Sequence, residues 1–154
     1  METLKPKTRE AVIQIAKWQL GVMEHPMGSN RVKYGEDYGL NGQAWCMMFV
    51  WWVFHEAGFN LHKTASCTTL ASRYKTAGQW VTEGFKPGDI AVFDFSGKRR
   101  RTQHCGIIIE VTDTHVVTIE GNTGDTNDAN GGAVMRRVRK LNLVTGACRP
   151  MYNM

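Results

Sequence analysis

The sequence predicts an α+β fold in which N-terminal helices pack on an antiparallel β-sheet. Apolar residues recur with the helical period before residue 88, whereas short apolar runs typical of strands follow it. Helices followed by strands, without alternation, are typical of α+β proteins. The 154 residues suffice for one core, and 42% hydrophobic with 21% charged residues is ordinary for a globular protein. We expect a single domain over residues 1–154.

Three segments have helical signals. In residues 8–21 the apolar side chains recur on one wide face. Residues 45–57 are apolar on nearly every side, which predicts a buried helix, and Gly58 follows as a stop signal. Residues 66–77 predict a third, shorter helix. The polar, glycine-rich residues 34–43 are expected to form a loop.

Five segments are predicted strands, because each is a short apolar run between polar or glycine-rich loops. They are residues 89–94, 106–112, 115–120, 133–139 and 146–151.

Cys46 is the first candidate for a chemical role. It begins the buried helix directly after the polar loop. Unpaired N–H groups and the helix dipole favour a negative charge at that place, and the thiolate is the nucleophilic form of cysteine. The alternative is a buried core cysteine, the reading that suits Cys67, Cys105 and Cys148.

His104 and Glu120 are candidate partners of this cysteine. His104 opens one predicted strand and Glu120 closes the next. A histidine that activates the thiol and an acid that orients the histidine would complete a nucleophilic site. The alternatives are a surface histidine and an ordinary carboxylate at a strand end.

The strand register decides whether these two side chains meet. Facing residues of an antiparallel pair have numbers with a constant sum, and side chains alternate faces. A two-residue turn pairs Thr112 with His115, a sum of 227, and turns Glu120 away from His104. A three-residue loop gives 226 and puts both on one face. We predict the even register, from an odd-length loop or a bulge.

The chain is basic, with a net charge of +5 and a pI of about 9.2. Such a charge suits nucleic acid, an anionic membrane or a bacterial cell wall. Two clusters, residues 98–101 and 136–140, hold eight of the 19 basic residues. No aromatic RNA-binding motif or helix-turn-helix pattern accompanies them, so nucleic acid is not the expected partner. They are expected to be solvated or to attract an anionic substrate.

Bound metals and targeting segments are not expected. Residues 125–131 look calcium-like, but Ala129 and Arg136 occupy ligand positions of the EF-hand template. Glu36 and Asp37 are another conceivable metal site. We expect no cofactor, with calcium as the alternative, and reduced cysteines. The polar first ten residues indicate no signal peptide, and no apolar run reaches the ~20 residues of a membrane helix.

Five blocks of the sequence resemble the CHAP domain, in order and in spacing. They are residues 30–34 (NRVKY), 44–50 (AWCMMFV), 85–90 (FKPGDI), 104–107 (HCGI) and 119–123 (IEGNT). The resemblance covers residues 12–150. Within the family, the sequence is similar to CHAP endolysins from phages of Gram-positive bacteria. It implies a papain-like α+β fold and cleavage of an amide bond in peptidoglycan, as N-acetylmuramoyl-L-alanine amidase or as crosslink endopeptidase.

The resemblance also implies residue roles. Cys46 is the nucleophile, His104 the base and later the acid, Glu120 the residue that orients His104, and Asn122 a fourth member. The Cys46 backbone N–H is the candidate oxyanion donor. The candidate substrate-binding residues are Tyr34, Tyr38, Gln43, Trp45, Arg99 and Arg100.

Two alternative functions remain open: an amidase of the same fold on a non-wall substrate, and a non-catalytic basic module that binds wall polymer or nucleic acid. The expected partner is bacterial peptidoglycan. The protein is expected to be a monomer, made in the cytoplasm as a phage or prophage product, that acts on the cell wall.

Overall fold

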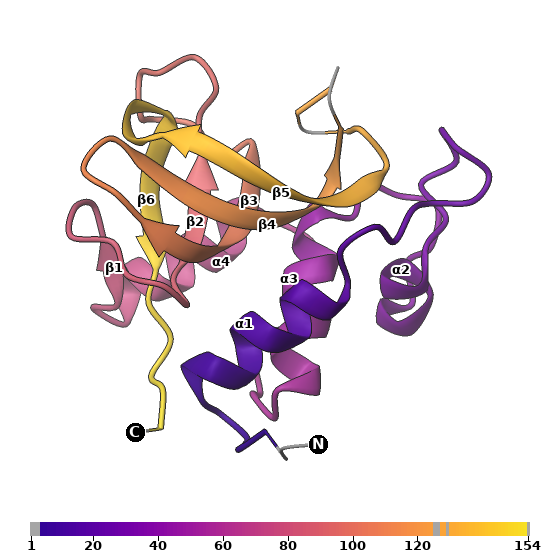
Figure 1. The fold of residues 1–154 in the computed structure, drawn as a ribbon, viewed down its shortest axis with the longest axis horizontal. Helices are drawn as coiled ribbons and strands as arrows, with labels where there is room; N and C mark the ends of the chain where they lie inside the picture. Colours follow the sequence, from indigo (N-terminus) through magenta and orange to yellow (C-terminus); the bar gives the residue numbers. More distant parts are fainter. Residues whose placement is uncertain (1–3, 125–126, 129, 154) are drawn as a thin grey trace.

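A computed structural model describes residues 4–124, 127–128 and 130–153, and it has the predicted α+β architecture (Figure 1). Within these residues four helices precede a six-stranded sheet. The helices are α1 (Arg9–Trp18), α2 (Lys33–Tyr38), α3 (Cys46–Glu56) and α4 (Cys67–Thr76). The strands are β1 (Trp80–Val81), β2 (Ile90–Phe93), β3 (His104–Val111), β4 (His115–Thr123), β5 (Ala133–Lys140) and β6 (Val144–Cys148).

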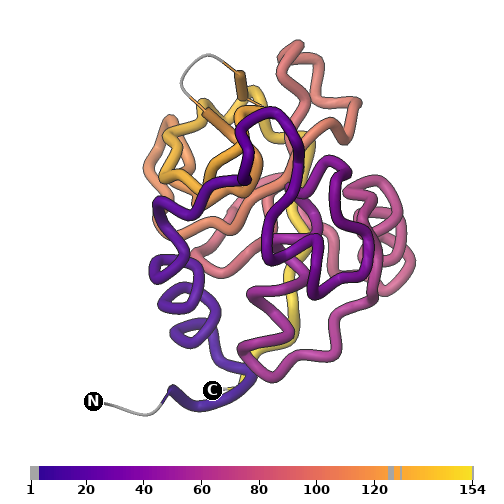
Figure 2. The backbone as a smooth tube through the Cα atoms, turned by 90° about the vertical axis from the view of Figure 1, so that its right-hand side faces the viewer, coloured from indigo at the N-terminus to yellow at the C-terminus, as the bar shows by residue number. Residues whose placement is uncertain are grey.

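The sheet is antiparallel throughout, with the order β1-β6-β2-β3-β4-β5. A short 3-10 turn, Leu141–Leu143, joins β5 to β6. The N-terminal and C-terminal segments lie side by side, where the Asn153 N–H donates to the Lys7 carbonyl at 2.8 Å (Figure 2).

The three predicted helices are confirmed. Capping side chains mark where α1 and α4 begin, and a glycine marks where α3 ends. Thr8 caps α1 by accepting the Ala11 N–H, and Ser66 caps α4 by accepting the Thr69 N–H. Gly58, at φ +88°, follows α3 in the left-handed conformation that glycine adopts without strain.

The loop predicted for residues 34–43 is wrong in part, because α2 occupies its first half. This helix has only six residues and contains Gly35, so neither its length nor its composition signals a helix. Packing stabilises it: the Tyr34 side chain is fully buried, and its hydroxyl donates to Gln19 Oε1 at 2.8 Å.

The predicted strands are present with shifted ends. β3 begins at His104, so this residue lies within the strand, and β4 extends to Thr123. The sequence analysis missed β1, which has two residues and pairs with the end of β6. Such a short edge strand has no period that a sequence pattern can reveal.

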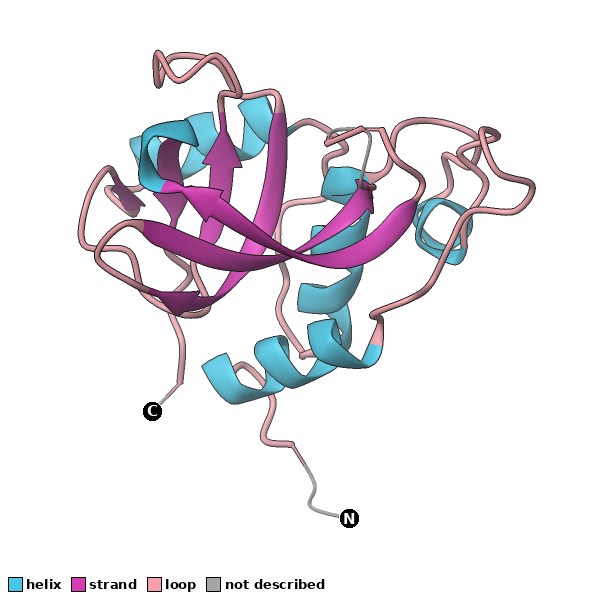
Figure 3. Ribbon diagram, turned by 45° about the horizontal axis from the view of Figure 1, so that its top comes forward, coloured by secondary structure: helices cyan, strands magenta, loops and turns pink. Residues whose placement is uncertain are grey.

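Two apolar cores lie on the two faces of the sheet. The larger core joins α1, α3 and α4 to one face, and α3 is buried along most of its length. Figure 3 shows α3 and α1 on the same side of the strands. The smaller core, on the opposite face, consists of Ala91, Phe93, Ile108, Val116 and Val144. None of the helices in the described residues is long and apolar enough to cross a membrane.

The β3–β4 hairpin has a two-residue turn, because the Thr112 N–H donates to the His115 carbonyl at 2.9 Å. Of the two origins predicted for an even register, an odd-length loop or a bulge, the loop is therefore excluded. A β-bulge between Ile108 and Glu110 then changes the register. Beyond the bulge the facing pairs are Ile108 with Thr118 and Ile107 with Ile119, whose numbers add to 226. The even register is thus confirmed, and the bulge produces it.

Candidate active site

Cys46 is the first residue of α3, and its side chain is partly exposed. The preceding residue, Trp45, is fully buried, and its indole N–H donates to Glu24 Oε2 at 3.1 Å. The buried helix and the anchored tryptophan therefore hold the thiol at the protein surface. The backbone N–H groups of this first helical turn lack intrahelical acceptors and favour a negative charge.

His104 is the first residue of β3 and is fully buried. Its ring lies beside those of Phe93 and Phe95, with centroid distances of 6.2 and 5.9 Å. Its Nε2 lies 2.9 Å from Glu120 Oε1. Its Nδ1 is buried and has no hydrogen-bond partner among the described residues. One ring nitrogen is thus occupied by Glu120, and the other makes no hydrogen bond to the described residues.

Glu120 is buried in β4 within a dense hydrogen-bond network. Arg139, from β5, binds both carboxylate oxygens, with Nε–Oε2 and Nη2–Oε1 distances of 2.9 and 2.5 Å. The Thr118 hydroxyl donates to Oε2 at 2.5 Å. Gly106 gives the carboxylate room, because a Cβ there would lie 2.5 Å from Glu120 Cγ. The network fixes Glu120 against His104.

The Glu120 contact determines the histidine tautomer. An ionised carboxylate only accepts hydrogen bonds, so the His104 Nε2 carries the proton and donates it to Glu120. In the neutral ring, the lone pair is then on Nδ1. This is the atom that can take a proton from a thiol and later return it.

Charge interactions favour a thiolate–imidazolium pair. Hydrogen bonds from Cys105 and Cys67, with a further contribution from His104, hold the pKa of Cys46 well below its ordinary value despite burial. Burial alone would lower the pKa of His104, but Cys46 and Glu120 raise it to about 9. Burial likewise opposes ionisation of Glu120, yet Arg139 and His104 lower its pKa to about 2. Near neutral pH His104 and Glu120 are therefore charged, and the imidazolium favours the thiolate form of Cys46.

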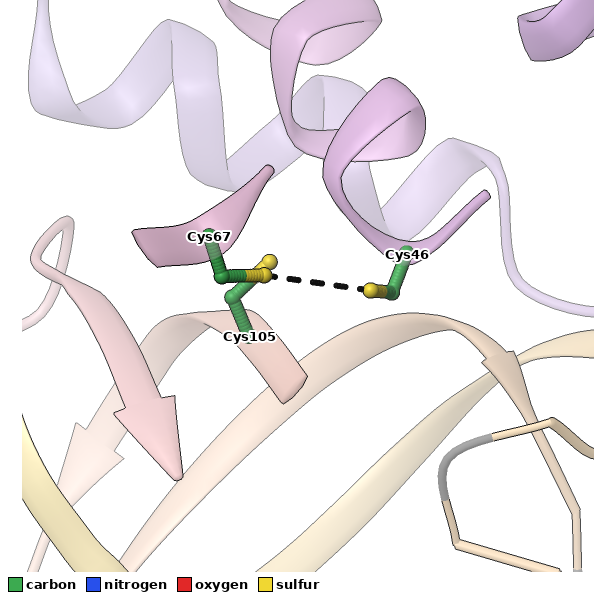
Figure 4. A group of neighbouring side chains, drawn as sticks. All are labelled: Cys46, Cys67 and Cys105. Carbon is green, nitrogen blue, oxygen red and sulfur yellow. Dashed lines mark hydrogen bonds between the residues drawn. The ribbon is translucent and has the colours of Figure 1, made fainter. Parts of the chain in front are cut away.

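Two further thiols surround the Cys46 sulfur (Figure 4). Cys67 begins α4 and places its sulfur 3.9 Å from Cys46 Sγ, while Cys105 is the second residue of β3. All four cysteines are free. The hydrogen bond from Cys105 acts to lower the pKa of Cys67, but Cys46 and burial raise it well above its ordinary value. Cys46, Cys67 and burial do the same for Cys105.

The comparisons with known proteins agree with this geometry. The family model described as the CHAP domain matches residues 37–122, more than half of the chain. The chain belongs to the CHAP-domain family. No curated protein matches the chain.

Solved structures share the fold of this CHAP domain. The crystal structure of Ly7917 matches with a TM-score of 0.57 at 17% identity, over 93% of this chain and 62% of that one. A second structure, Ly7917 with the hydrolyzing product of MDP, matches with a TM-score of 0.54 at 15% identity, over 93% and 63%. The chain thus spans less than two thirds of the length of Ly7917.

Asn122 is buried in the CHAP domain, but its side-chain hydrogen bonds hold a loop. Its amide donates to Asn130 Oδ1 at 3.0 Å and accepts the Gly132 N–H at 3.1 Å. Its backbone has φ +56°, a strained value for a residue other than glycine. The side chain therefore shapes the connection between β4 and β5, and Glu120 alone of the two holds His104.

The substrate-binding candidates near Cys46 fall into two groups. Tyr34 and Trp45 are fully buried, so the expectation that they contact substrate is wrong, because the core needs both rings. Tyr38 is partly exposed and packs edge-on against Trp51, and Gln43 is exposed. Only Tyr38 and Gln43 remain on the surface.

The two basic clusters also differ from a uniformly solvated surface. Arg99 donates to the carbonyls of Val144 and Thr82 at 2.9 and 2.7 Å, so it anchors its loop. Arg100 keeps an exposed side chain. In the second cluster Arg139 is buried against Glu120, which contradicts the expectation of a solvated residue there.

The calcium-like segment lies partly outside the described residues, which omit 125, 126 and 129. Within it, Asp128 Oδ1 accepts from Arg137 and Arg139 at 2.6 and 2.8 Å, so arginines neutralise this carboxylate. Asp37, of the other conceivable site, accepts the Trp52 indole N–H at 2.7 Å.

Three site residues escaped the sequence analysis: Arg139, Cys67 and Cys105. Arg137 and Arg139 alternate with Val138, the period of a strand with one basic face, and this was the available signal for Arg139. For the cysteines the only signal was that Cys67 follows a capping serine and Cys105 follows His104. Neither indicates that their sulfurs meet.

Proposed function

We propose that this CHAP domain is a peptidoglycan hydrolase that cleaves an amide bond of the stem peptide or crosslink, with Cys46 as nucleophile. The observation that carries the proposal is a partly exposed thiol at the start of α3 whose pKa His104 helps to lower, together with the 2.9 Å contact between this buried histidine and Glu120. A nucleophile, a base and an acid that orients the base are the parts that nucleophilic catalysis requires, and packing alone does not require them together.

The first half of the reaction forms a thioester. The Cys46 thiolate attacks the carbonyl carbon of the amide, and the electron pair moves to the carbonyl oxygen. Backbone N–H groups at the start of α3, that of Cys46 among them, stabilise this oxyanion. As the intermediate collapses, protonated His104 gives its Nδ1 proton to the departing amine, and the C–N bond breaks.

The second half releases the acid. Neutral His104 takes a proton from water at Nδ1, and the hydroxide formed attacks the thioester carbonyl. The C–S bond breaks, and Cys46 returns as a thiolate beside the imidazolium. Glu120 and Arg139 keep the ring oriented in both halves, since both lie on the Nε2 side.

The substrate class rests on the family and on charge. Membership of the CHAP-domain family implies cleavage of an amide bond in peptidoglycan. Ly7917, which shares the fold, was solved with the hydrolyzing product of MDP. The net charge of +5 suits an anionic wall. We infer action on the bacterial cell wall by a phage or prophage product, as amidase or as endopeptidase.

Digestion of purified cell walls tests this function. Wild-type protein and the control Cys148→Ser, whose cysteine is not among the three sulfurs that meet at Cys46, should clear the suspension, whereas Cys46→Ala should not. Mass spectrometry of the released fragments identifies the bond: free muramoyl chains indicate an amidase, and split stem or crossbridge peptides an endopeptidase. If wild type released no fragment but hydrolysed small amides, the substrate would lie outside the wall. Wall binding without any hydrolysis would indicate a binding module.

A further inference from the structure

Three sulfur atoms converge on one point beside the α3 N-terminus (Figure 4). The sulfurs of Cys46, Cys67 and Cys105 all lie within 4.8 Å of one another, and Cys46 to Cys67 measures 3.9 Å. They come from α3, α4 and β3, elements far apart in the sequence. Hydrogen bonds from Cys67 and Cys105 lower the pKa of Cys46, but a cysteine nucleophile requires only one histidine and one orienting acid, so the meeting of three sulfurs suits a further role.

We propose that Cys46, Cys67 and Cys105 form a binding site for a thiophilic metal ion of the Zn²⁺ or Cu⁺ class. An ion held there would occupy the nucleophile and stop hydrolysis until it is removed. The inhibition rests on the function proposed above, whereas the site itself does not.

The sulfur spacing fits coordination. With a Zn–S bond of about 2.3 Å, two thiolates on one ion lie about 3.8 Å apart in a tetrahedral site and about 4.0 Å apart in a trigonal one. The Cys46–Cys67 distance of 3.9 Å lies between these values. A disulfide would need about 2.05 Å. The Cys46 and Cys67 sulfurs are therefore spaced to share an ion, and the Cys105 sulfur lies within 4.8 Å of both.

The surroundings suit soft ions, which displace the thiol protons of Cys67 and Cys105 when they bind. Cys46 and Cys67 are the first residues of α3 and α4, so two helix N-termini favour negative charge at the cluster. The Met47 thioether accepts a hydrogen bond from the Cys105 thiol at 3.8 Å, so a further soft sulfur borders the cluster. Thiolate and thioether ligands prefer ions such as Cu⁺ and Zn²⁺ to calcium or magnesium.

The cluster is both rigid and reachable. Cys105 is fully buried in β3, where it faces Val92 of β2, and Cys67 is 7% exposed. Their positions are thus set by the core, whereas the partly exposed Cys46 provides an entry path. On binding, each thiol that coordinates releases its proton to solvent as its S–metal bond forms.

A cadmium titration of the reduced protein tests the site without reference to hydrolysis. Cd²⁺ should produce an ultraviolet sulfur-to-metal charge-transfer band that saturates at one ion per protein. Cys67→Ser and Cys105→Ser should each weaken binding at least tenfold, while Cys148→Ser should bind as wild type does. Melting curves of the metal-free variants verify that they fold. Equal affinity in wild type, Cys67→Ser and Cys105→Ser, or no band in wild type, would overturn the site.

A second readout uses the wild-type protein alone, so it does not depend on whether a variant folds. Bound Zn²⁺ should slow alkylation of Cys46 at least tenfold, and a chelator should restore the rate. Alkylation at an unchanged rate under saturating Zn²⁺ would contradict coordination by Cys46. If walls are hydrolysed, Zn²⁺ should stop lysis reversibly in wild type and in Cys148→Ser. A protein that binds Cd²⁺ but never hydrolyses walls would refute the proposed function and leave the metal site standing.

Discussion

At the residue scale, Glu120 determines how the imidazole is held. Four donor atoms reach its carboxylate: His104 Nε2, the Thr118 hydroxyl, and two nitrogens of Arg139. Charge-assisted hydrogen bonds of this kind stabilise an ionised acid in a buried place. Glu120 in turn stabilises the charged imidazole, so the same carboxylate sets both the orientation and the protonation state of His104.

Activity should therefore have a bell-shaped pH dependence. The rate at low substrate should rise as Cys46 loses its proton, at a pH below the ordinary range of a thiol, because its pKa is lowered. It should fall as pH rises through about 9, where His104 loses the proton that the leaving amine needs. Wall-clearing rates between pH 4 and 11 measure both limbs. A rate that keeps rising through pH 10 would contradict a protonated His104 as the acid.

Arg139→Gln should destabilise the protein, because it leaves the buried Glu120 carboxylate without its main partner. The expected loss is about 3 kcal/mol at neutral pH. Glu120 has a lowered folded-state pKa of about 2, so its contribution is present above its ordinary value and is lost as pH falls toward 2. The difference between wild type and variant should thus shrink in acid.

Urea unfolding at pH 7 and at pH 3 measures this difference. Arg136→Gln is the matched control, since this neighbouring arginine is about half exposed and lies 3.9 Å from an exposed Glu110. It should unfold like wild type. An Arg139→Gln variant as stable as Arg136→Gln would show that the buried ion pair contributes nothing.

At the scale of elements, the helices with long, local sequence patterns are the predictable ones. α1, α3 and α4 have helical periodicity, capping residues or glycine stops. α2 has no such pattern, and its six residues are stabilised by burial of Tyr34. Tertiary packing decides such short elements.

The candidate site was predictable to a similar extent. Cys46, His104 and Glu120 lie at element ends that the sequence marks, and the even register that joins the last two was expected. Arg139 was not, because its contact with Glu120 depends on the register of β4 with β5, which the sequence leaves undetermined. The Cys67 contact depends on where α4 packs, and no local pattern specifies that.

The cap of α4 should matter for stability, since it positions Cys67. Ser66→Ala removes the side chain that accepts the Thr69 N–H, and the expected cost is about 1 kcal/mol. Ser66→Asp keeps an acceptor at the same place and should remain close to wild type. Thermal unfolding of the three proteins tests this. Equal losses in both variants would show that the hydroxyl acts by something other than capping.

At the scale of the whole molecule, positive charge is the feature that suits an anionic wall. If wall binding depends on the exposed residues Lys98, Arg100 and Arg101, lysis should weaken as salt rises, because exposed charges are screened over about 8–10 Å at 0.1–0.15 M. Changing these three residues to Gln should weaken wall binding with little loss of stability. Arg99→Gln should instead destabilise the loop that Arg99 anchors.

A cell-wall pelleting assay at increasing salt measures this binding. If neither salt nor the triple substitution changed lysis and binding, these three residues would not be the source of attraction to the wall.

The central claim is that the Cys46 thiolate performs the hydrolysis, and alkylation tests it most directly. Limiting iodoacetamide should modify Cys46 first, because the other three cysteines are buried. Peptide mass spectrometry gives the modified fraction, and wall clearing gives the remaining activity. The account predicts that activity falls in proportion to Cys46 modification and reaches zero at one label per protein. Full clearing activity after complete modification of Cys46 would contradict it.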